Sequence, residues 1–167
     1  GEKVWRDRDG TEFSIVRVSG VAVFLTSSPH GTPPLLLHHV RHVRALHEHV
    51  VLVTVATRHV PRVRDRRFEF RQLPEGICRL HVYCGFMESP NVPRALAAAV
   101  QEYGLPFRSA EVTYFLGRET LLALPQGKMR QREEALFAFL SRNSQNATRY
   151  FCIPPERVME VGMQIDL

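Results

Sequence analysis

Residues 50–56 read Val-Val-Leu-Val-Thr-Val-Ala, an apolar run without the polar alternation of a half-exposed strand. Such a run is typical of a strand that is covered on both faces, as in the centre of an α/β sheet. A strand of this kind needs helices on both sides, and a chain of 167 residues suits one domain. We therefore expect a single α/β domain with a mixed β-sheet of about five to seven strands flanked by about three helices.

The remaining strands follow from β-branched and aromatic runs. Residues 13–18 and 21–25 are two such runs joined at Ser19–Gly20, where glycine permits a turn or a bulge, so they predict an opening strand or a hairpin. Residues 68–70 and 77–86 alternate around a Pro-Glu-Gly turn and predict a second hairpin. Cys78 and Cys84 are among the hairpin residues that should face inward, so we expect both to be small core residues. Further strands are expected at 112–116, ending at a glycine, and at 158–167.

Three helices are expected between these strands. The first should take Thr32 as N-cap and Pro33 as its first residue, and its apolar stripe extends to an end near His47. The second should follow the cap at 89–91 and stop at Gly104, and the third should span about residues 128–142. The stripe positions of the first two helices are Leu36, Leu37, Val40, Val43, Leu46, His47, Val92, Leu96, Val100 and Tyr103.

The sequence favours a soluble protein of a reducing compartment that binds or regulates and is not an enzyme. Its apolar runs are far shorter than the ~20 residues that span a bilayer, and three cysteines without a C-x-x-C pair indicate neither a disulfide framework nor a zinc site. Nucleophile elbows, H-E-x-x-H helices and glycine-rich phosphate loops are missing from the sequence. No cofactor is indicated.

Five histidines crowd residues 38–49: His38, His39, His42, His47 and His49. His38 and His42 share a helix face and offer a metal site, completed by His49 or Glu48, but Arg41 and Arg44 disfavour a bound cation. We interpret the cluster as the polar side of a helix and expect no metal. A modest pH response near neutrality is a separate hypothesis, because histidine changes its charge there.

The net charge of +5 comes almost wholly from arginine, and the densest arginine run lies between residues 58 and 71. Such a run faces anionic lipid head groups, nucleic acid or simply solvent. The sequence pI of about 9.6 and the interleaved Phe68 and Phe70 favour the nucleic-acid alternative. The absence of a recognisable nucleic-acid reading motif disfavours it, so we interpret the run as a solvated face and expect no nucleic-acid partner.

Four strings in the right order resemble the C-terminal cytoplasmic region of Kup/HAK-type potassium uptake transporters. They are Arg17–Thr26, Gly85–Glu88, Tyr114–Leu121, and Ser141–Asn143 followed by Ala147–Thr148. The end of the chain, from Pro155 to Leu167, is similar to the natural end of such a protein. Ser19 departs from the family, which commonly has proline at this turn.

The resemblance implies that residues 13–167 are a cytoplasmic domain of a proton-coupled potassium transporter at the inner cell membrane. Residues 1–12 are then an expression remnant or a linker from the membrane part. The implied role is regulation, assembly or stability of the transporter, without transport activity of the domain itself. The implied partners are the transmembrane part and a second copy in a homodimer. Some relatives in the wider family respond to a cyclic dinucleotide, so a nucleotide second messenger is a further partner to consider.

Two segments are candidates for ligand or subunit contact. Arg118, Glu119 and Thr120 follow an expected strand and its glycine, the place where α/β sheets hold ligands. Arg142 and Asn143 end the third expected helix and complement that site. The alternative is structural: Arg118 and Glu119 form an ion pair, and Asn143 caps a helix.

Overall fold

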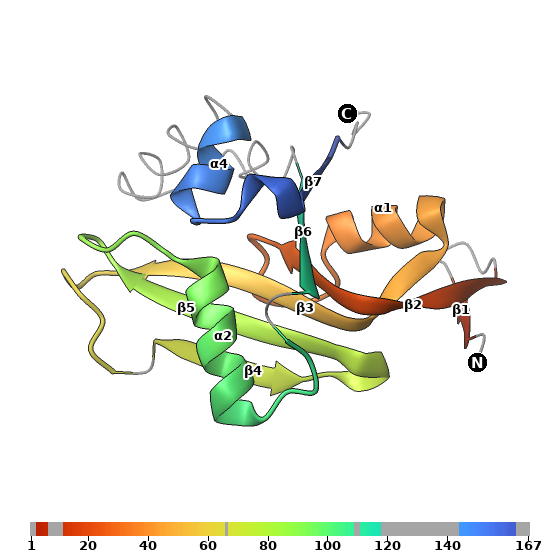
Figure 1. Ribbon diagram of the computed structural model, residues 1–167, viewed down its shortest axis with the longest axis horizontal. Coiled ribbons are helices and arrows are strands. Elements are labelled where there is room, and N and C mark those ends of the chain that lie inside the picture. The colour runs from red at the N-terminus through yellow and green to blue at the C-terminus, as the bar shows by residue number, and fades with distance from the viewer. Residues whose placement is uncertain (1–2, 7–11, 66, 109–110, 118–143, 163–167) are drawn as a thin grey trace.

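One seven-stranded sheet organises the protein (Figure 1). The computed structural model describes residues 3–6, 12–65, 67–108, 111–117 and 144–162. The strands are β1 (Lys3–Arg6), β2 (Glu12–Leu25), β3 (Ala45–Arg58), β4 (Phe68–Gln72), β5 (Ile77–Gly85), β6 (Val112–Gly117) and β7 (Val158–Val161). The helices of the described part are α1 (Pro34–Val43), α2 (Val92–Tyr103) and α4 (Ser144–Tyr150), with 3₁₀ turns at Pro74–Gly76 and Pro155–Arg157.

The strand order is β4-β5-β3-β2-β6-β7, with β1 pairing antiparallel to β2. Strands β2, β3, β5, β6 and β7 run parallel, and β4 is antiparallel to β5. From β2 the chain moves outward through β3 to β5 and then returns past β2 to β6. The direction of winding therefore reverses between β2 and β6, as in a doubly wound fold. The predicted mixed α/β sheet is confirmed.

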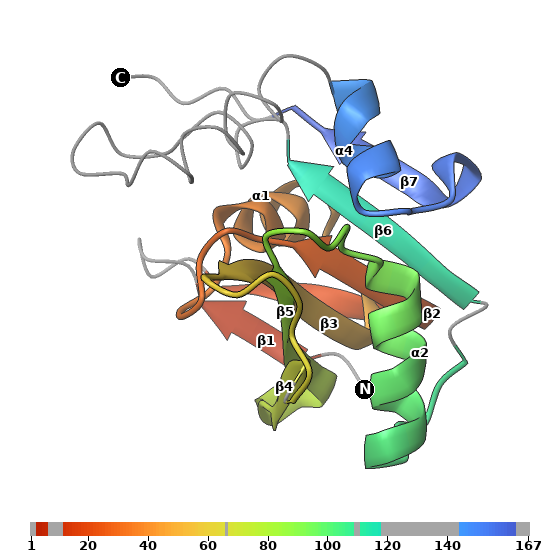
Figure 2. The same ribbon diagram turned by 90° about the vertical axis from the view of Figure 1, so that its left-hand side faces the viewer.

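Both faces of the sheet are packed, which explains the apolar run at 50–56 (Figure 2). Val51 and Val53 of β3 belong to a core shared with α2 and with residues of and after α4. Val50 and Leu52 belong to a second core shared with α1. Successive side chains of a strand point to opposite faces, so a strand between two cores must be apolar at every position.

Helix α1 differs from its prediction at both ends. Pro33 is the N-cap and has no side-chain cap, and the helix ends at Val43, where Arg44 adopts a left-handed conformation. Leu46 and His47 already belong to β3, opposite Arg17 and Val18 of β2. The predicted end near His47 was wrong because strand pairing took over residues that also fit the helical spacing. The predicted stripe is wrong at Leu37 and Val43, which are 47% and 56% exposed.

The two opening runs form one continuous strand, β2, and the hairpin alternative is wrong. The pairing register with β3 shifts between Val18 and Val21, and Gly20 has φ of 110°. The glycine therefore supplies a bulge and not a turn.

The second half of the described chain follows the prediction more closely. The β4–β5 hairpin forms around Pro74–Gly76, and α2 begins after Asn91, whose Oδ1 accepts a hydrogen bond from the Arg94 N–H at 2.9 Å. Helix α2 ends at Gly104, and β6 ends at Gly117, as expected. Phe86 is an exception, because it is exposed and not inward. The third predicted helix lies outside the described residues, and the short α4 was not predicted.

The two hairpin cysteines behave as structural residues. Cys84 is buried and Cys78 is partly buried, and burial raises the pKa of both thiols. A raised pKa keeps a thiol protonated and therefore weakly nucleophilic.

Candidate functional site: a basic pocket on the open face of the sheet

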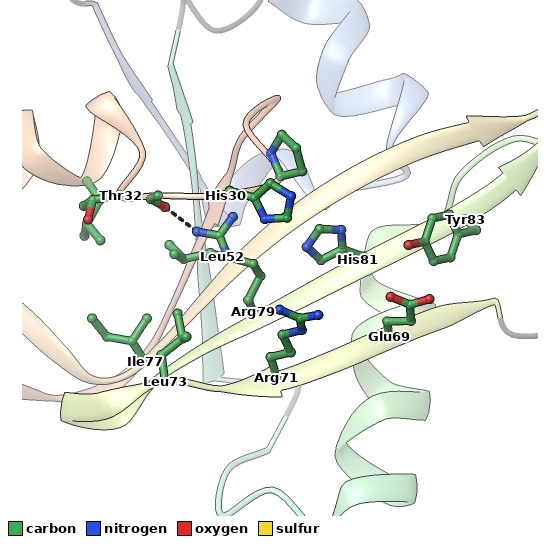
Figure 3. Close-up of a pocket in the computed structure, with 13 residues that line it drawn as sticks. His30, Thr32, Leu52, Glu69, Arg71, Leu73, Ile77, Arg79, His81 and Tyr83 are labelled. Atoms are coloured by element: carbon green, nitrogen blue, oxygen red, sulfur yellow. Dashed lines mark hydrogen bonds between the residues drawn. The ribbon is translucent and has the colours of Figure 1, made fainter.

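A pocket of about 490 Å³ lies on the α1 side of the sheet, above β3, β5 and β4 (Figure 3). Its existence follows from the topology: β3 connects to β5 through the β4 hairpin, and no helix stands in that connection among the described residues. The loop from β2 to α1 closes one side of it. The lining residues are Pro29, His30, Gly31, Thr32, Leu36, Leu52, Glu69, Arg71, Leu73, Ile77, Arg79, His81 and Tyr83.

Arg79 is the structural centre of the pocket. Alternation along β5 places Ile77, Arg79, His81 and Tyr83 on this face, and Arg79 is only 6% exposed. Its guanidinium donates hydrogen bonds to the carbonyl oxygen of Ser28, at 3.0 Å, and to that of Gly31. Burial lowers the pKa of Arg79, but an arginine stays charged at any physiological pH. A buried cation therefore holds the β2–α1 loop over the sheet.

Positive charge dominates the polar part of the pocket. Arg71 of β4 lies directly opposite Arg79 in the strand pair, and Glu69 lies opposite His81. Burial, and then the nearby Arg79 charge, lowers the pKa of His81, which favours the neutral imidazole. Two arginines thus face a single carboxylate in this pocket.

Apolar side chains also line the pocket, with Leu52, Leu73 and Ile77 at one end and the ring of Tyr83 at the other (Figure 3). The lining holds no serine or cysteine, and Glu69 is its one carboxylate. The pocket therefore has the groups to bind a small anion with an apolar or flat part.

The histidines of residues 38–49 separate in the structure. The rings of His38 and His42 lie 4.4 Å apart on α1, whereas His39 and His47 lie against Phe115, at 4.8 and 6.1 Å between ring centroids. His49 lies beside Phe107 instead. Within the described residues, no group of three or more His, Cys, Asp or Glu side chains is placed to hold a metal ion.

His39 is buried in the α1 core, and His47 is half-buried. Burial lowers the pKa of both, and the Nδ1 atom of His47 is buried without a hydrogen-bond partner in the described structure. Both rings therefore favour the neutral form. This arrangement supports the hypothesis of a pH response through stability and not through a metal.

The aromatic residues of the arginine run are committed to packing inside the protein. Phe68 and Phe70 contact Tyr103 of α2, with ring centroids 6.3 and 4.8 Å apart, and the Phe70 ring is stacked on that tyrosine. Their rings are thus not presented beside the arginines for stacking with nucleic-acid bases. Of the two features that favoured a nucleic-acid partner, the interleaved phenylalanines therefore no longer support it, and the high pI is left.

The residues predicted to contact a ligand or subunit, Arg118, Glu119, Thr120, Arg142 and Asn143, lie outside the described residues. They remain predictions. The pocket residues were not singled out from the sequence, although alternation in a hairpin places 69 and 71 on the same face as 79, 81 and 83. That signal was present, but it does not show that the 26–33 loop folds over this face.

No helix of the described chain is long and apolar enough to cross a membrane. The chain is 49% identical over 152 residues to the "Probable potassium transport system protein Kup" of Acidiphilium cryptum, an alignment that covers 90% of the chain and 24% of that relative. It is 45% identical over 153 residues to the protein of the same description from Myxococcus xanthus, covering 91% of the chain and 23% of the relative. The chain thus spans about a quarter of the length of these relatives.

No solved structure matches the chain. The family described as "K+ potassium transporter C-terminal domain" matches residues 19–167, nearly the whole chain. This match and the identity to Kup proteins agree with the resemblance of the four sequence strings. The chain therefore belongs to the family of potassium transporter C-terminal domains.

Proposed function

We propose that this domain regulates or assembles a proton-coupled potassium transporter, lying on the cytoplasmic face of the membrane and carrying no transport activity of its own. The observation that carries the proposal is the match of residues 19–167 to the C-terminal domain family, within relatives about four times as long. On this proposal, the potassium pathway lies in the part of the transporter outside this chain.

The partners of the domain are the transmembrane part of the same transporter and a second copy in a homodimer. Leu37 and Val43 of α1 are exposed apolar side chains and are candidates for such a contact.

Potassium uptake by cells that carry the full-length transporter, with and without residues 13–167, tests this function. Unchanged abundance in the membrane with altered uptake would indicate regulation, and lost abundance would indicate assembly or stability. Unchanged abundance together with unchanged uptake would refute both. The matched control is Gly162→Ala, because an added Cβ at Gly162 has no neighbour within 4 Å.

A second candidate function is the sensing of a nucleotide or another small phosphate-bearing ligand. The observation that favours it is the pocket, where Arg71 and Arg79 face an apolar floor and Tyr83. Its volume of about 490 Å³ falls in the range of small-molecule sites. Regulation by such a ligand would act through the β2–α1 loop that Arg79 holds.

Calorimetry with a panel of nucleotides tests this candidate. Arg71→Gln should abolish the heat of binding, whereas Arg94→Gln, an exposed arginine of α2, should leave it unchanged. No heat with any nucleotide would remove the candidate but leave the assembly role untouched. Crosslinking from position 118 in the full-length transporter would show whether the predicted Arg118 segment contacts a subunit instead.

A further inference from the structure

The carboxyl ends of β3 and β5 form a structured tip at one end of the sheet, on the left of Figure 1. The tip comprises residues 58–65, Arg67 and residues 85–88. Its two loops are joined by hydrogen bonds from the Phe86 N–H to the Val60 carbonyl, at 2.9 Å, and from the Met87 N–H to the Pro61 carbonyl, at 3.1 Å. Parallel neighbouring strands end at the same edge, so the sheet itself brings these loops together.

A carboxylate fixes the geometry of the tip. One oxygen of Glu88 accepts hydrogen bonds from the backbone N–H groups of Val63 and Gly85, both at 2.9 Å, and the other lies 3.3 Å from a guanidinium nitrogen of Arg67. The two backbone donors lower the pKa of Glu88, so the carboxylate remains ionised at neutral pH. Val63 is buried beneath the loop and anchors it. The tip is thus a built platform.

Three large apolar side chains project from this platform into solvent: Val60 is 41% exposed, Phe86 51% and Met87 68%. Arg62, Arg64 and Arg67 are exposed around them. Arg58 lies at the base, with its guanidinium 4.0 Å from the centre of the Tyr83 ring. Asp65 and Glu88 are the carboxylates of the described tip, and Glu88 is held by the clamp, so the outward charge is positive.

A tip that carries both exposed apolar side chains and exposed arginines matches one kind of surface well. Apolar side chains gain by entering the boundary between head groups and acyl chains, and arginines gain beside lipid phosphates. Nucleic acid would use the arginines but offers Val60 and Met87 nothing comparable. We propose that this tip docks on an anionic lipid bilayer, with Phe86 and Met87 entering the boundary region and the arginines contacting lipid phosphates. The inference goes beyond the proposed function and does not require it.

Co-sedimentation of the 167-residue chain with vesicles tests the docking. We expect binding to phosphatidylcholine vesicles that contain about a quarter phosphatidylglycerol, little binding to pure phosphatidylcholine, and weaker binding in high salt. Phe86→Ser with Met87→Ser leaves the charge unchanged and should lower partitioning at least about tenfold. The matched control is Val16→Ser with Met159→Ser, which removes two apolar side chains that are each 54% exposed, on β2 and β7 outside the tip, and should have no effect.

The arginine contribution is tested separately. Each arginine near an anionic surface contributes about fivefold to partitioning, so Arg62→Gln with Arg64→Gln should weaken binding about 25-fold. The matched control, Arg94→Gln with Arg108→Gln, removes the same charge from exposed positions outside the tip. Met87→Ser alone, at the most exposed of the three apolar positions, gives a variant that keeps the fold if the Phe86 change does not.

Three outcomes would overturn the proposal. The first is no preference for anionic over neutral vesicles. The second is equal loss of binding in the tip variants and their matched controls. The third is a folded Phe86→Ser, Met87→Ser variant that binds vesicles as well as the parent and also binds a short single-stranded DNA tightly. That result would assign the arginines to nucleic acid.

Discussion

Replacing Gly85 with alanine should force apart the two loops at the end of the sheet. An added Cβ would lie 2.3 Å from the Pro61 carbonyl oxygen, 2.5 Å from its carbon and 2.6 Å from the Val60 carbonyl oxygen. All three are backbone atoms, so no side-chain rotation relieves the overlap. The loop bearing Val60 and Pro61 must move, and the two hydrogen bonds that these carbonyls accept from Phe86 and Met87 are then lost or stretched.

The cost follows from these contacts. A backbone hydrogen bond contributes about 1 kcal/mol net, so the loss of two destabilises the fold by about 2 kcal/mol, and by about 4 kcal/mol if the freed groups stay buried and unpaired. Alanine would otherwise favour a strand position over glycine by about 0.5 kcal/mol, which reduces the effect only slightly. For a chain of this size, 2 kcal/mol corresponds to a melting temperature lower by about 4–8 °C.

Urea unfolding followed by circular dichroism measures this difference. The control is Gly162→Ala, which introduces the same atom where no neighbour lies within 4 Å. We expect its free energy of unfolding to stay within about 0.5 kcal/mol of that of the parent. Equal midpoints for the Gly85 and Gly162 variants would refute the argument, because the close approach of the two backbones would then cost nothing to disrupt.

Three further predictions use the same unfolding measurement. Burial lowers the pKa of His39 and His47 below 6.5, so the unfolded state binds more protons than the folded state below that pH. The free energy of unfolding should therefore fall as the pH is lowered from about 7.5 to about 5.5, by up to about 1.4 kcal/mol per pH unit for each histidine. His47→Gln should make this dependence on pH less steep. Arg79→Met should lower the free energy of unfolding by about 2–4 kcal/mol, because the two hydrogen bonds to the β2–α1 loop are lost. Arg71 is exposed, so Arg71→Met should lower it by less than about 0.5 kcal/mol. Equal effects of the two changes would contradict the role of Arg79 as the residue that holds the loop. Asn91→Ala should cost about 1 kcal/mol, because the Arg94 N–H loses its cap, and an unchanged midpoint would show that the cap is dispensable.

Sequence patterns predicted the elements whose signals were local. The unalternating run at 50–56 placed β3 in the sheet centre, and Asn91 and Gly104 marked both ends of α2. The end of α1 could not be read in this way, since Leu46 and His47 continue the helical spacing. Only their pairing with β2, some 30 residues earlier in the chain, assigns them to a strand.

The pocket depends even more on distant contacts. Its arginines come from neighbouring strands of a hairpin that was predicted, but its wall is the loop at 26–33, which the sequence presents only as a cluster of helix breakers. The loop lies over the sheet because Arg79, about 50 residues later, donates to its carbonyl groups. The alternation along β5 predicts that an arginine at position 79 faces solvent. Its burial, with hydrogen bonds to a distant loop, could not be predicted from periodicity.

The bulge in β2 has a consequence for how homologous chains can differ in length. Ile15 lies in the same core as Ala22 and Phe24, although it is an odd-numbered position and they are even. The extra residue between Val18 and Val21 reverses which positions face α1, so deleting it would turn Ile15 to the opposite face. Deleting one residue here should therefore destabilise the fold, whereas an exchange at Ser19 removes no pairing with β3.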